Sequence, residues 1–275
     1  MVEEGEDAEM KNFKRFVLTI LFFFSLPIVI GMMPFPNNEK FVPATPEEKI
    51  LYAANDLVVS DVAPPKDPFK VLLLFTHSHE TYKPFLENEK GMVAVYDDQA
   101  NLYSMHQLFE DYFRLNGITT NTLDVDVMSV LKENGKTIVD AYKTVRPYVA
   151  EELKTNQYDL ILDIHRDSTS RNKTTVVHKN VSYAKVSFVI GAENPNYKSN
   201  KAIAQTISNS MNEIIPNISK GIIEKKGTGV DGVYNQDLAK EFILIEIGGI
   251  DNTEDEVYRT VAVLAQAVAN SLVEK

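Results

Sequence analysis

Three largely apolar runs, each followed by a histidine or a carboxylate, constrain the fold of this chain most. The runs and the polar residues that follow them are Val71–Phe75 with His77 and Glu80, Leu160–Ile164 with His165, and Phe242–Ile245 with Glu246. Apolar runs without alternation are typical of strands that are buried on both faces. In open α/β sheets, functional groups gather at the carboxyl ends of the strands. The pattern therefore predicts an α/β fold in which these polar residues meet at one edge of a sheet.

The polar residues at the three strand ends have the chemistry of a metal site. Two histidines and one glutamate can bind zinc and leave a fourth position for water, while a second glutamate acts as a base. The chain contains no cysteine, so any metal would be bound by nitrogen and oxygen atoms. An ordinary polar loop after a strand is the alternative interpretation of the segment from His77 to Glu80. Of the two histidines in this segment, we take His79 to be the weaker candidate for a ligand.

The other two strand ends also allow two interpretations each. His165 could be a histidine at the edge of the core that bonds Asp167, or a metal ligand whose second ring nitrogen faces Asp163 or Asp167. Glu246 lies inside an apolar strand, where a carboxylate is costly unless it is paired or metal-bound. It could form a buried salt bridge or act as a proton acceptor, and the glycines Gly248–Gly249 permit a close backbone approach such as that of a substrate.

Three further polar features of the sequence are weaker candidates for function. The turn Tyr234–Asp237 carries amide side chains that suit oxyanion stabilisation or amide recognition, or it is simply a turn. His106 within a helix and His178 in a hairpin-like segment have no candidate partners nearby in the sequence, and we interpret both as surface residues.

The first third of the chain predicts a membrane anchor and a stalk. The segment from Phe16 to Met33 holds 18 residues without a charge, enough to cross a membrane. Positive residues directly before it place the N-terminus in the cytoplasm. We therefore predict a cytoplasmic tail at 1–15, a signal anchor at 16–34, a Pro-rich stalk at 35–68 and an extracytoplasmic catalytic domain at 69–275. A cleaved signal peptide is the alternative to the anchor.

Strands and helices alternate after the stalk, which predicts a mostly parallel sheet sandwiched by helices. The expected strands are 70–75, 118–124, 158–164, 185–190 and 242–247, and the expected helices are 98–115, 136–154, 198–214 and 254–272. Asn116–Gly117 predicts the end of the first helix, and Asn252–Thr253 the capped start of the last one.

Composition and missing motifs exclude several functions. The formal net charge of -11 argues against a nucleic-acid partner. The G-x-S-x-G motif of serine hydrolases is absent from the sequence. A Gly-rich phosphate-binding loop is absent as well.

Several ordered motifs give the chain a specific resemblance to a known family. They are Thr76–Tyr82, Asp163–Ser168, Tyr234–Leu238 and Ile245–Thr253, with further similar segments at Ala141–Tyr142, Phe188–Gly191 and Asn194. In this order they resemble the stage II sporulation protein P family of endospore-forming bacteria, over about residues 69–272. The predicted membrane anchor also resembles that family.

The resemblance implies a zinc-dependent peptidoglycan hydrolase with an amidase-like or phosphorylase/hydrolase-like α/β fold. Members resemble N-acetylmuramoyl-L-alanine amidases, are credited with endopeptidase activity, and degrade septal wall during engulfment with a lytic transglycosylase and a membrane protein as partners. By the same resemblance His77, Glu80 and His165 would bind zinc and Glu246 would be the catalytic glutamate. Asp97 or Asp98 could replace Glu80 as the carboxylate ligand.

The chain departs from the family in the segment after Tyr142, where the family usually has a run rich in serine and arginine. The details of the substrate therefore stay open, and so does a role of this chain outside engulfment, as a paralogue of the family. Two other functions also stay open: a metallo-endopeptidase or carboxypeptidase acting on stem peptides with the same site, and a non-enzymatic scaffold that binds the wall.

Overall fold

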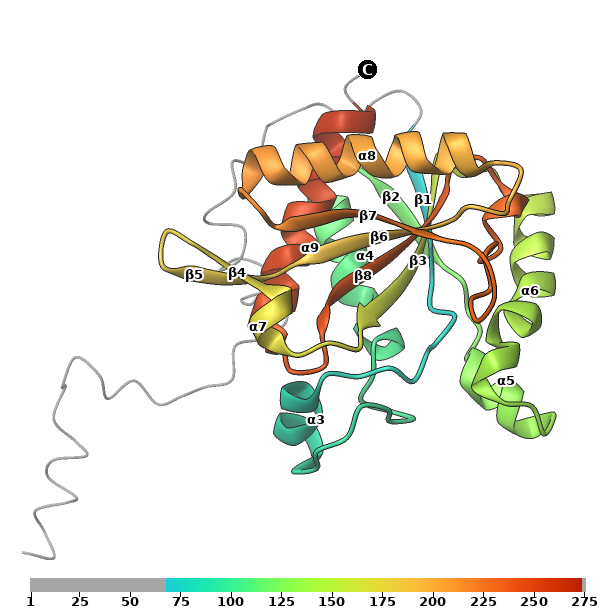
Figure 1. Cartoon of the computed structure of the whole chain (residues 1–275), viewed down its shortest axis with the longest axis horizontal. Helices are drawn as coiled ribbons and strands as arrows, with labels where there is room; N and C mark the ends of the chain where they lie inside the picture. The colour runs from blue at the N-terminus through green and yellow to red at the C-terminus, as the bar shows by residue number, and fades with distance from the viewer. Residues whose placement is uncertain (1–67, 274–275) are drawn as a thin grey trace, which may run out of the picture. The chain divides into compact units, whose positions relative to one another are not determined.

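The three apolar runs form neighbouring strands at the centre of one sheet. In the computed structural model, which describes residues 68–273, the strands β1 (Lys70–Leu74), β3 (Leu160–Asp167) and β8 (Phe242–Gly249) pair in parallel, β1 with β3 and β3 with β8. Figure 1 shows them inside a layer with helices on both sides. Apolar side chains therefore fill both faces of these strands, as the unbroken runs predicted.

The complete sheet of the described residues is mostly parallel, as predicted, and one antiparallel pairing makes it mixed. Its strand order is β2-β1-β3-β8-β6-β7, with β2 at Thr119–Thr122, β6 at Val186–Gly191 and β7 at Ser219–Lys225. β2 and β7 pair in parallel with their neighbours β1 and β6, whereas β6 is antiparallel to β8. The α/β class is confirmed, and β6 and β7 run opposite to the other strands of the sheet.

The reversal at β6 follows from the short connection that precedes it. After β3 the chain forms α7 (Arg171–Thr174) and a hairpin of β4 (Thr175–His178) and β5 (Val181–Ala184), and then enters β6. A parallel pairing needs a crossover that returns the chain to the other edge of the sheet, usually with a helix. The connection between β3 and β6 does not bring the chain back to the edge where β3 begins, so β6 runs in the opposite direction to β3. The hairpin confirms the interpretation of the segment around His178.

Helices cover the two faces of the sheet separately. The helices α5 (Val127–Glu133) and α6 (Ala141–Thr155) pack on one face. The helices α4 (His106–Leu115), α8 (Tyr197–Ile214) and α9 (Glu254–Val268) pack on the other. Figure 1 shows α5 and α6 across the sheet from α9. The remaining helix α3 (Lys83–Lys90) follows the segment that contains His77 and Glu80.

The predicted helices exist, but two of them begin later than expected. α4 starts at His106 instead of 98, because the Asp97 carboxylate accepts hydrogen bonds from the backbone N–H of Gln99 and of Ala100 and holds a turn there. α6 starts at Ala141 instead of 136, after a 3₁₀ turn at Ile138–Asp140. The last helix ends as a π-helical turn, Ala269–Val273.

Both predicted helix caps are confirmed by the backbone geometry. Gly117 ends α4 with φ +72°, in the left-handed region that glycine adopts without a steric cost. Thr253 caps α9 in a reciprocal pair with Glu256: each side chain accepts a hydrogen bond from the other's backbone N–H.

Several short elements escaped prediction because their local signals are weak. They are α3, α5, α7 and β7, whereas β4 and β5 form the hairpin that was expected around His178. Strand β7 has only half-buried and exposed residues and includes charged ones, as an edge strand does. Helix α5 begins at Asp126, whose carboxylate accepts a hydrogen bond from the Ser129 backbone N–H. At seven residues α5 is too short for its periodicity to stand out.

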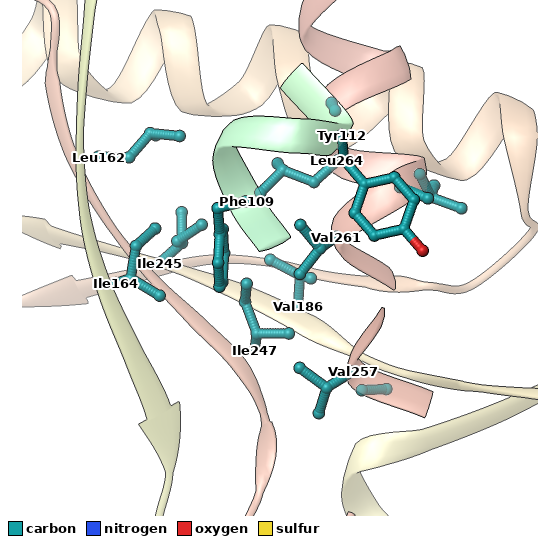
Figure 2. Close-up of a cluster of buried hydrophobic side chains, with 14 of the residues drawn as sticks. Phe109, Tyr112, Leu162, Ile164, Val186, Ile245, Ile247, Val257, Val261 and Leu264 are labelled. Atoms are coloured by element: carbon teal, nitrogen blue, oxygen red, sulfur yellow. The ribbon is translucent and has the colours of Figure 1, made fainter. Parts of the chain in front are cut away.

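The main hydrophobic core lies between the sheet and the helices α4, α8 and α9. Figure 2 shows the Phe109 ring of α4 between isoleucines of the sheet and Val261 of α9. The Phe109 side chain is fully buried and packs edge-to-face on Phe75, with 6.0 Å between ring centroids. This ring therefore joins α4 to both the sheet and α9.

The predicted tail, signal anchor and stalk lie outside the described residues, apart from Pro68 at the end of the stalk. Among residues 68–273, no helix is both long enough and apolar enough to cross a membrane.

Replacing Phe109 with alanine tests the core. Removing a buried phenylalanine loses its transfer free energy and leaves a cavity, so we expect Phe109→Ala to lower the free energy of unfolding by about 3–5 kcal/mol. Denaturant unfolding followed by circular dichroism measures this change. The exposed Tyr148 on α6 supplies the control: Tyr148→Ala should change stability by less than about 0.5 kcal/mol. Equal losses in the two variants would contradict the assigned core.

Candidate active site

The candidate residues meet on the face of the sheet that α5 and α6 cover, toward the carboxyl ends of β1, β3 and β8. His165 of β3 lies in register with Glu246 of β8, and Asp163 lies in register with Leu244. Side chains of registered residues in parallel strands point to the same face. His77 follows β1 by three residues and reaches the same point, since its ring centroid is 5.1 Å from that of His165. The structure thus brings together residues from three distant parts of the sequence.

His77 presents a ring nitrogen that nothing in the described structure satisfies. Its Nδ1 is buried and makes no hydrogen bond within residues 68–273, and its ring meets that of His165 edge-to-face. Burial and, to a smaller extent, the neighbouring His165 together lower the pKa of His77 to about 4. The imidazole is therefore neutral at physiological pH, which is the form that binds metal ions.

His165 is buried between two carboxylates. Its Nε2 lies 3.1 Å from Oδ1 of Asp163, at an angle that does not make a hydrogen bond, and its Nδ1 lies 3.8 Å from Oε2 of Glu80. Burial on its own would lower the pKa of His165. The charges of Asp163 and Glu80 outweigh burial and raise this pKa to about 9. The ring therefore carries a proton when no cation competes for the same carboxylates.

Asp163 is the acidic neighbour of His165, and Asp167 is not. The Asp163 carboxylate is fully buried and accepts hydrogen bonds from the backbone N–H and the hydroxyl of Thr76, at 3.0 and 2.7 Å. Asp167 pairs instead with Nζ of Lys220 at 2.9 Å and accepts a bond from the Thr169 backbone N–H. The two open interpretations of the partner of His165 therefore resolve in favour of Asp163.

Glu80 is held in the site by the backbone around it. The side chain is only 7% exposed, and its Oε2 accepts a hydrogen bond from the Arg166 backbone N–H at 3.1 Å. The Glu80 backbone N–H donates to the His77 carbonyl, and Glu80 also forms a β-bridge with Tyr96. Burial raises the pKa of Glu80, while the charges of His165 and Arg166 counteract that rise.

The two rival carboxylates are engaged elsewhere or exposed. Asp97 pairs with Nζ of Lys90 at 2.6 Å and supports the turn before α4. The Asp98 side chain is 70% exposed and lies 3.9 Å from Lys90. His79, the weaker histidine candidate, bonds Asp126 through its Nε2 at 2.9 Å. Of these acidic candidates, Glu80 is the one that the described structure brings beside His165.

Glu246 has no bonded partner in the described part of the chain. The side chain is half-buried, and within residues 68–273 it makes neither a hydrogen bond nor an ion pair. The alternative interpretation as a buried salt bridge is therefore wrong for these residues. Burial raises the pKa of Glu246, and the negative charge of Asp167 raises it further. A carboxylate that is open to water and has a raised pKa can accept a proton and donate it again.

The turn Tyr234–Asp237 is structural, because its amide groups are used inside the protein. Gln236 is fully buried, accepts a bond from the Gly191 backbone N–H and donates to the Val189 carbonyl. The Asn235 amide donates to the Tyr142 carbonyl at 2.8 Å, and its carbonyl oxygen accepts from Arg146. These amides are not free to bind a substrate.

The paired glycines at the end of β8 also serve packing. A Cβ atom on Gly249 would lie 2.1 Å from the Thr169 carbonyl oxygen, so the close approach is to this chain's own backbone. The next turn is held by Asn252, whose carbonyl oxygen accepts from the Gly249 N–H and the Thr174 hydroxyl. The prediction of a substrate groove at Gly248–Gly249 is replaced by a tight internal contact.

The site contains one residue to which the sequence motifs assigned no role. Tyr142, near the start of α6, contacts the rings of both His77 and His165. Its contacts join segments far apart in the sequence, so no local pattern could have indicated them. The two other predicted histidines lie apart from the site, but both are half-buried: His106 begins α4 and bonds the Tyr103 carbonyl, and His178 lies in the β4–β5 hairpin.

The donor set has the chemistry of a metal site bound by nitrogen and oxygen. His77 offers a buried, unpartnered Nδ1, and His165 directs Nδ1 toward Glu80 while its Nε2 faces the Asp163 carboxylate. A metal-bound histidine usually has a carboxylate at its second nitrogen in this way. Among residues 68–273, no three His, Asp or Glu side chains stand close enough together to hold a metal ion as they are.

Comparison with known proteins gives a family match over most of the chain. The family model of stage II sporulation protein P matches residues 38–269. A curated relative, stage II sporulation protein P of Bacillus subtilis (strain 168), is 34% identical over 201 residues, which are 71% of this chain and 50% of the relative. The chain therefore spans about half the length of the curated relative that it matches.

The solved structures to which the chain is similar share little sequence with it. Cwp6 from Clostridium difficile is 16% identical, with a TM-score of 0.42 over 76% of this chain and 30% of that one. An N-acetylmuramoyl-L-alanine amidase from Clostridium difficile 630 is 13% identical, with a TM-score of 0.45 over 76% of this chain and 100% of that one. A metallo-carboxypeptidase from Burkholderia cenocepacia is 9% identical, with a TM-score of 0.43 over 78% and 59%.

Proposed function

This chain belongs to the stage II sporulation protein P family, and we propose that it is a zinc-dependent hydrolase of peptidoglycan. The proposed reaction is cleavage of the amide bond between N-acetylmuramic acid and L-alanine, in septal wall that is degraded during sporulation. The single observation that supports it most is the pairing of His165 with Glu246 in register, with His77 and Glu80 beside His165. This arrangement combines potential ligands with an unpaired carboxylate, as hydrolysis of an amide requires.

His77, Glu80 and His165 are the residues that would hold the zinc ion. Their donors are the unpartnered Nδ1 of His77, the Nδ1 of His165 and the Glu80 carboxylate. When bound, zinc supplies a Lewis acid that polarises the amide carbonyl and acidifies a water molecule. Three protein ligands leave a coordination position open, which is typical of catalytic sites and not of structural ones.

The remaining steps depend on side chains of the chain itself. Glu246 lies half-buried beside His165 with no bonded partner among the described residues, so it can take the proton of the attacking water. Its raised pKa makes it a competent donor of the same proton to the leaving amine nitrogen. Asp163, anchored to Thr76, fixes the His165 ring through its charge.

Digestion of purified cell wall by the wild-type chain tests the proposed function. We expect mass spectrometry of the soluble products to find muramic acid with a free lactyl carboxyl group, together with free stem peptides that begin with L-alanine. New ends within the stem peptides would instead support a metallo-endopeptidase or carboxypeptidase that uses the same site. Intact wall, together with measurable binding to it, would support a non-enzymatic scaffold.

The metal prediction concerns zinc content. Replacing His77 with alanine or Glu80 with glutamine removes a donor that other residues of the site cannot supply, so each variant should lose zinc and activity while it keeps its fold. Elemental analysis measures the zinc content and circular dichroism the fold, on the same preparation. His178→Ala, in the distant hairpin, is the matched control and should keep its zinc. Full zinc occupancy in either site variant removes that residue from the ligand set, and Asp98→Ala then tests the rival carboxylate.

The prediction for Glu246 concerns rate without loss of zinc. Glu246→Gln keeps the size of the side chain but cannot accept the proton of water, so the rate of wall digestion should fall by about 10²–10⁴. Zinc content and melting temperature should match those of the wild type. Glu224→Gln, on the edge strand β7, is the control and should keep full activity, since Glu224 pairs with Lys201 on the surface, away from the site. Near-normal turnover in Glu246→Gln would place the base elsewhere, with Glu80 or Asp167 next in order.

We also propose that residues 16–34 anchor the chain in the cytoplasmic membrane with the catalytic domain outside. The charge-free run and the lysines and arginine before it support this orientation. A lytic transglycosylase and a membrane scaffold protein of the engulfment machinery are the proposed partners.

A reporter enzyme fused after Lys275 tests the orientation. A reporter that folds only outside the cytoplasm should be active, because the wall substrate and the catalytic domain must share a compartment. Its cytoplasm-specific counterpart, fused at the same residue, is the control and should be inactive. The reverse pattern would contradict both the orientation and a wall substrate.

A further inference from the structure

Tyr142 contacts both candidate histidines although no motif gives it a role. It is the second residue of α6, the helix that leads directly into β3. Its ring meets that of His77 edge-to-face, with 5.5 Å between centroids, and lies nearly parallel to that of His165, with 6.2 Å between centroids and 23° between the planes. The ring therefore lies directly beside both candidate histidines.

The hydroxyl of Tyr142 is free to bind something that the protein does not provide. Within residues 68–273 it makes no hydrogen bond, and it is not among the buried polar atoms that lack a partner. The side chain as a whole is half-buried. A hydroxyl that lacks an internal partner and is not enclosed can donate to a ligand in the site.

The backbone of Tyr142 is fixed by the turn before β8, through a hydrogen bond from an amide side chain and a neighbouring ion pair. The Asn235 amide donates to the Tyr142 carbonyl at 2.8 Å, and Arg146 donates to the Asn235 carbonyl oxygen at 3.1 Å. Arg146 also forms two bonds to the Asp237 carboxylate, at 2.8 and 2.7 Å. This clamp ties the first turn of α6 to the turn around Asn235, so the position of the Tyr142 ring is set independently of substrate.

The turn that makes this clamp has an unusual backbone. Tyr234 and Asn235 both have positive φ, at 53° and 56°, which costs free energy for residues other than glycine and persists where the surroundings enforce it. The conformation places the Tyr234 ring edge-to-face on Tyr142, with 5.1 Å between centroids. Tyr142 is thus held by an aromatic contact on its side chain and by hydrogen bonds on its backbone.

The phenol of Tyr142 stays protonated across the physiological range. An ordinary phenol has a pKa of about 10, well above physiological pH. Such a group can donate a hydrogen bond to a developing negative charge, but it does not act as a base or a nucleophile.

We propose that Tyr142 is a catalytic residue, whose hydroxyl donates a hydrogen bond to the carbonyl oxygen of the scissile amide as that oxygen gains negative charge. This inference rests on the proposed function, since it assigns a role in the same hydrolysis. The proton stays on the phenol throughout, and the bond is strongest when the carbonyl carbon has become tetrahedral. Preorganised donors of this kind act mainly on the transition state.

The variant Tyr142→Phe tests the role, because it keeps the ring contacts and removes only the hydroxyl. The whole 275-residue chain is used, with a soluble N-acetylmuramoyl peptide as substrate. We expect kcat to fall by about 10²–10³ with KM changed by less than about threefold. Zinc content and melting temperature should be unchanged. Tyr148→Phe, on the exposed side of the same helix, is the matched control and should behave as the wild type.

A second measurement separates a transition-state contact from a packing role. A phosphinate analogue of the muramoyl amide has a tetrahedral centre with negatively charged oxygens, so its affinity should fall in Tyr142→Phe by a factor similar to kcat. The affinity for the cleaved stem peptide should change much less. Calorimetric titration of wild-type and variant chains gives both values.

The outcomes distinguish this inference from the function on which it rests. A wild-type kcat in Tyr142→Phe overturns the assignment of Tyr142 and leaves the proposed function intact. A lower melting temperature and lower zinc content that accompany the loss of activity do the same. A wild-type chain that cleaves neither wall nor muramoyl peptide overturns the proposed function, and the role of Tyr142 with it.

Discussion

The buried carboxylate of Asp163 is the interaction on which the arrangement of the site depends. A charged group inside a protein is costly unless hydrogen bonds and an opposite charge compensate it. Asp163 obtains this compensation from the backbone N–H and hydroxyl of Thr76 and from the charge of His165. Thr76 directly precedes His77 in the chain. One carboxylate therefore fixes where β1 ends, where the segment with His77 begins, and how the ring of His165 stands between them.

Much of the site could be predicted because the relevant residues follow apolar runs. The position after a buried strand places His77, His165 and Glu246 at one edge of the sheet, whatever the order of the strands. Tyr142 could not be found in this way, because its place depends on the contact between Arg146 and Asp237, which are 91 residues apart. The amides of the turn Tyr234–Asp237 looked functional for the same reason: their internal partners are invisible in the local sequence.

The direction of β6 shows a second limit of reasoning from local pattern. Its side chains are all buried, like those of the parallel strands β3 and β8, so its composition predicts a central strand but not its direction. Direction is decided by the connection, and the short path through α7 and the hairpin sends the chain back. As a result Glu246 lies on the last strand of the parallel group, with His165 on one side and Ser187 of the reversed strand on the other.

The contact at Gly249 has a consequence for which sequences this fold can accept. The β3–β8 register shifts after His165, and Gly249 then pairs with Asp167, with its α-carbon pressed against the Thr169 carbonyl. Even a methyl group there would push apart the two strands that carry His165 and Glu246. A saturation library at position 249, selected for folded and active chains, should return glycine alone, although the residue touches neither histidine. The most restrictive position near the site is thus one that has no side chain.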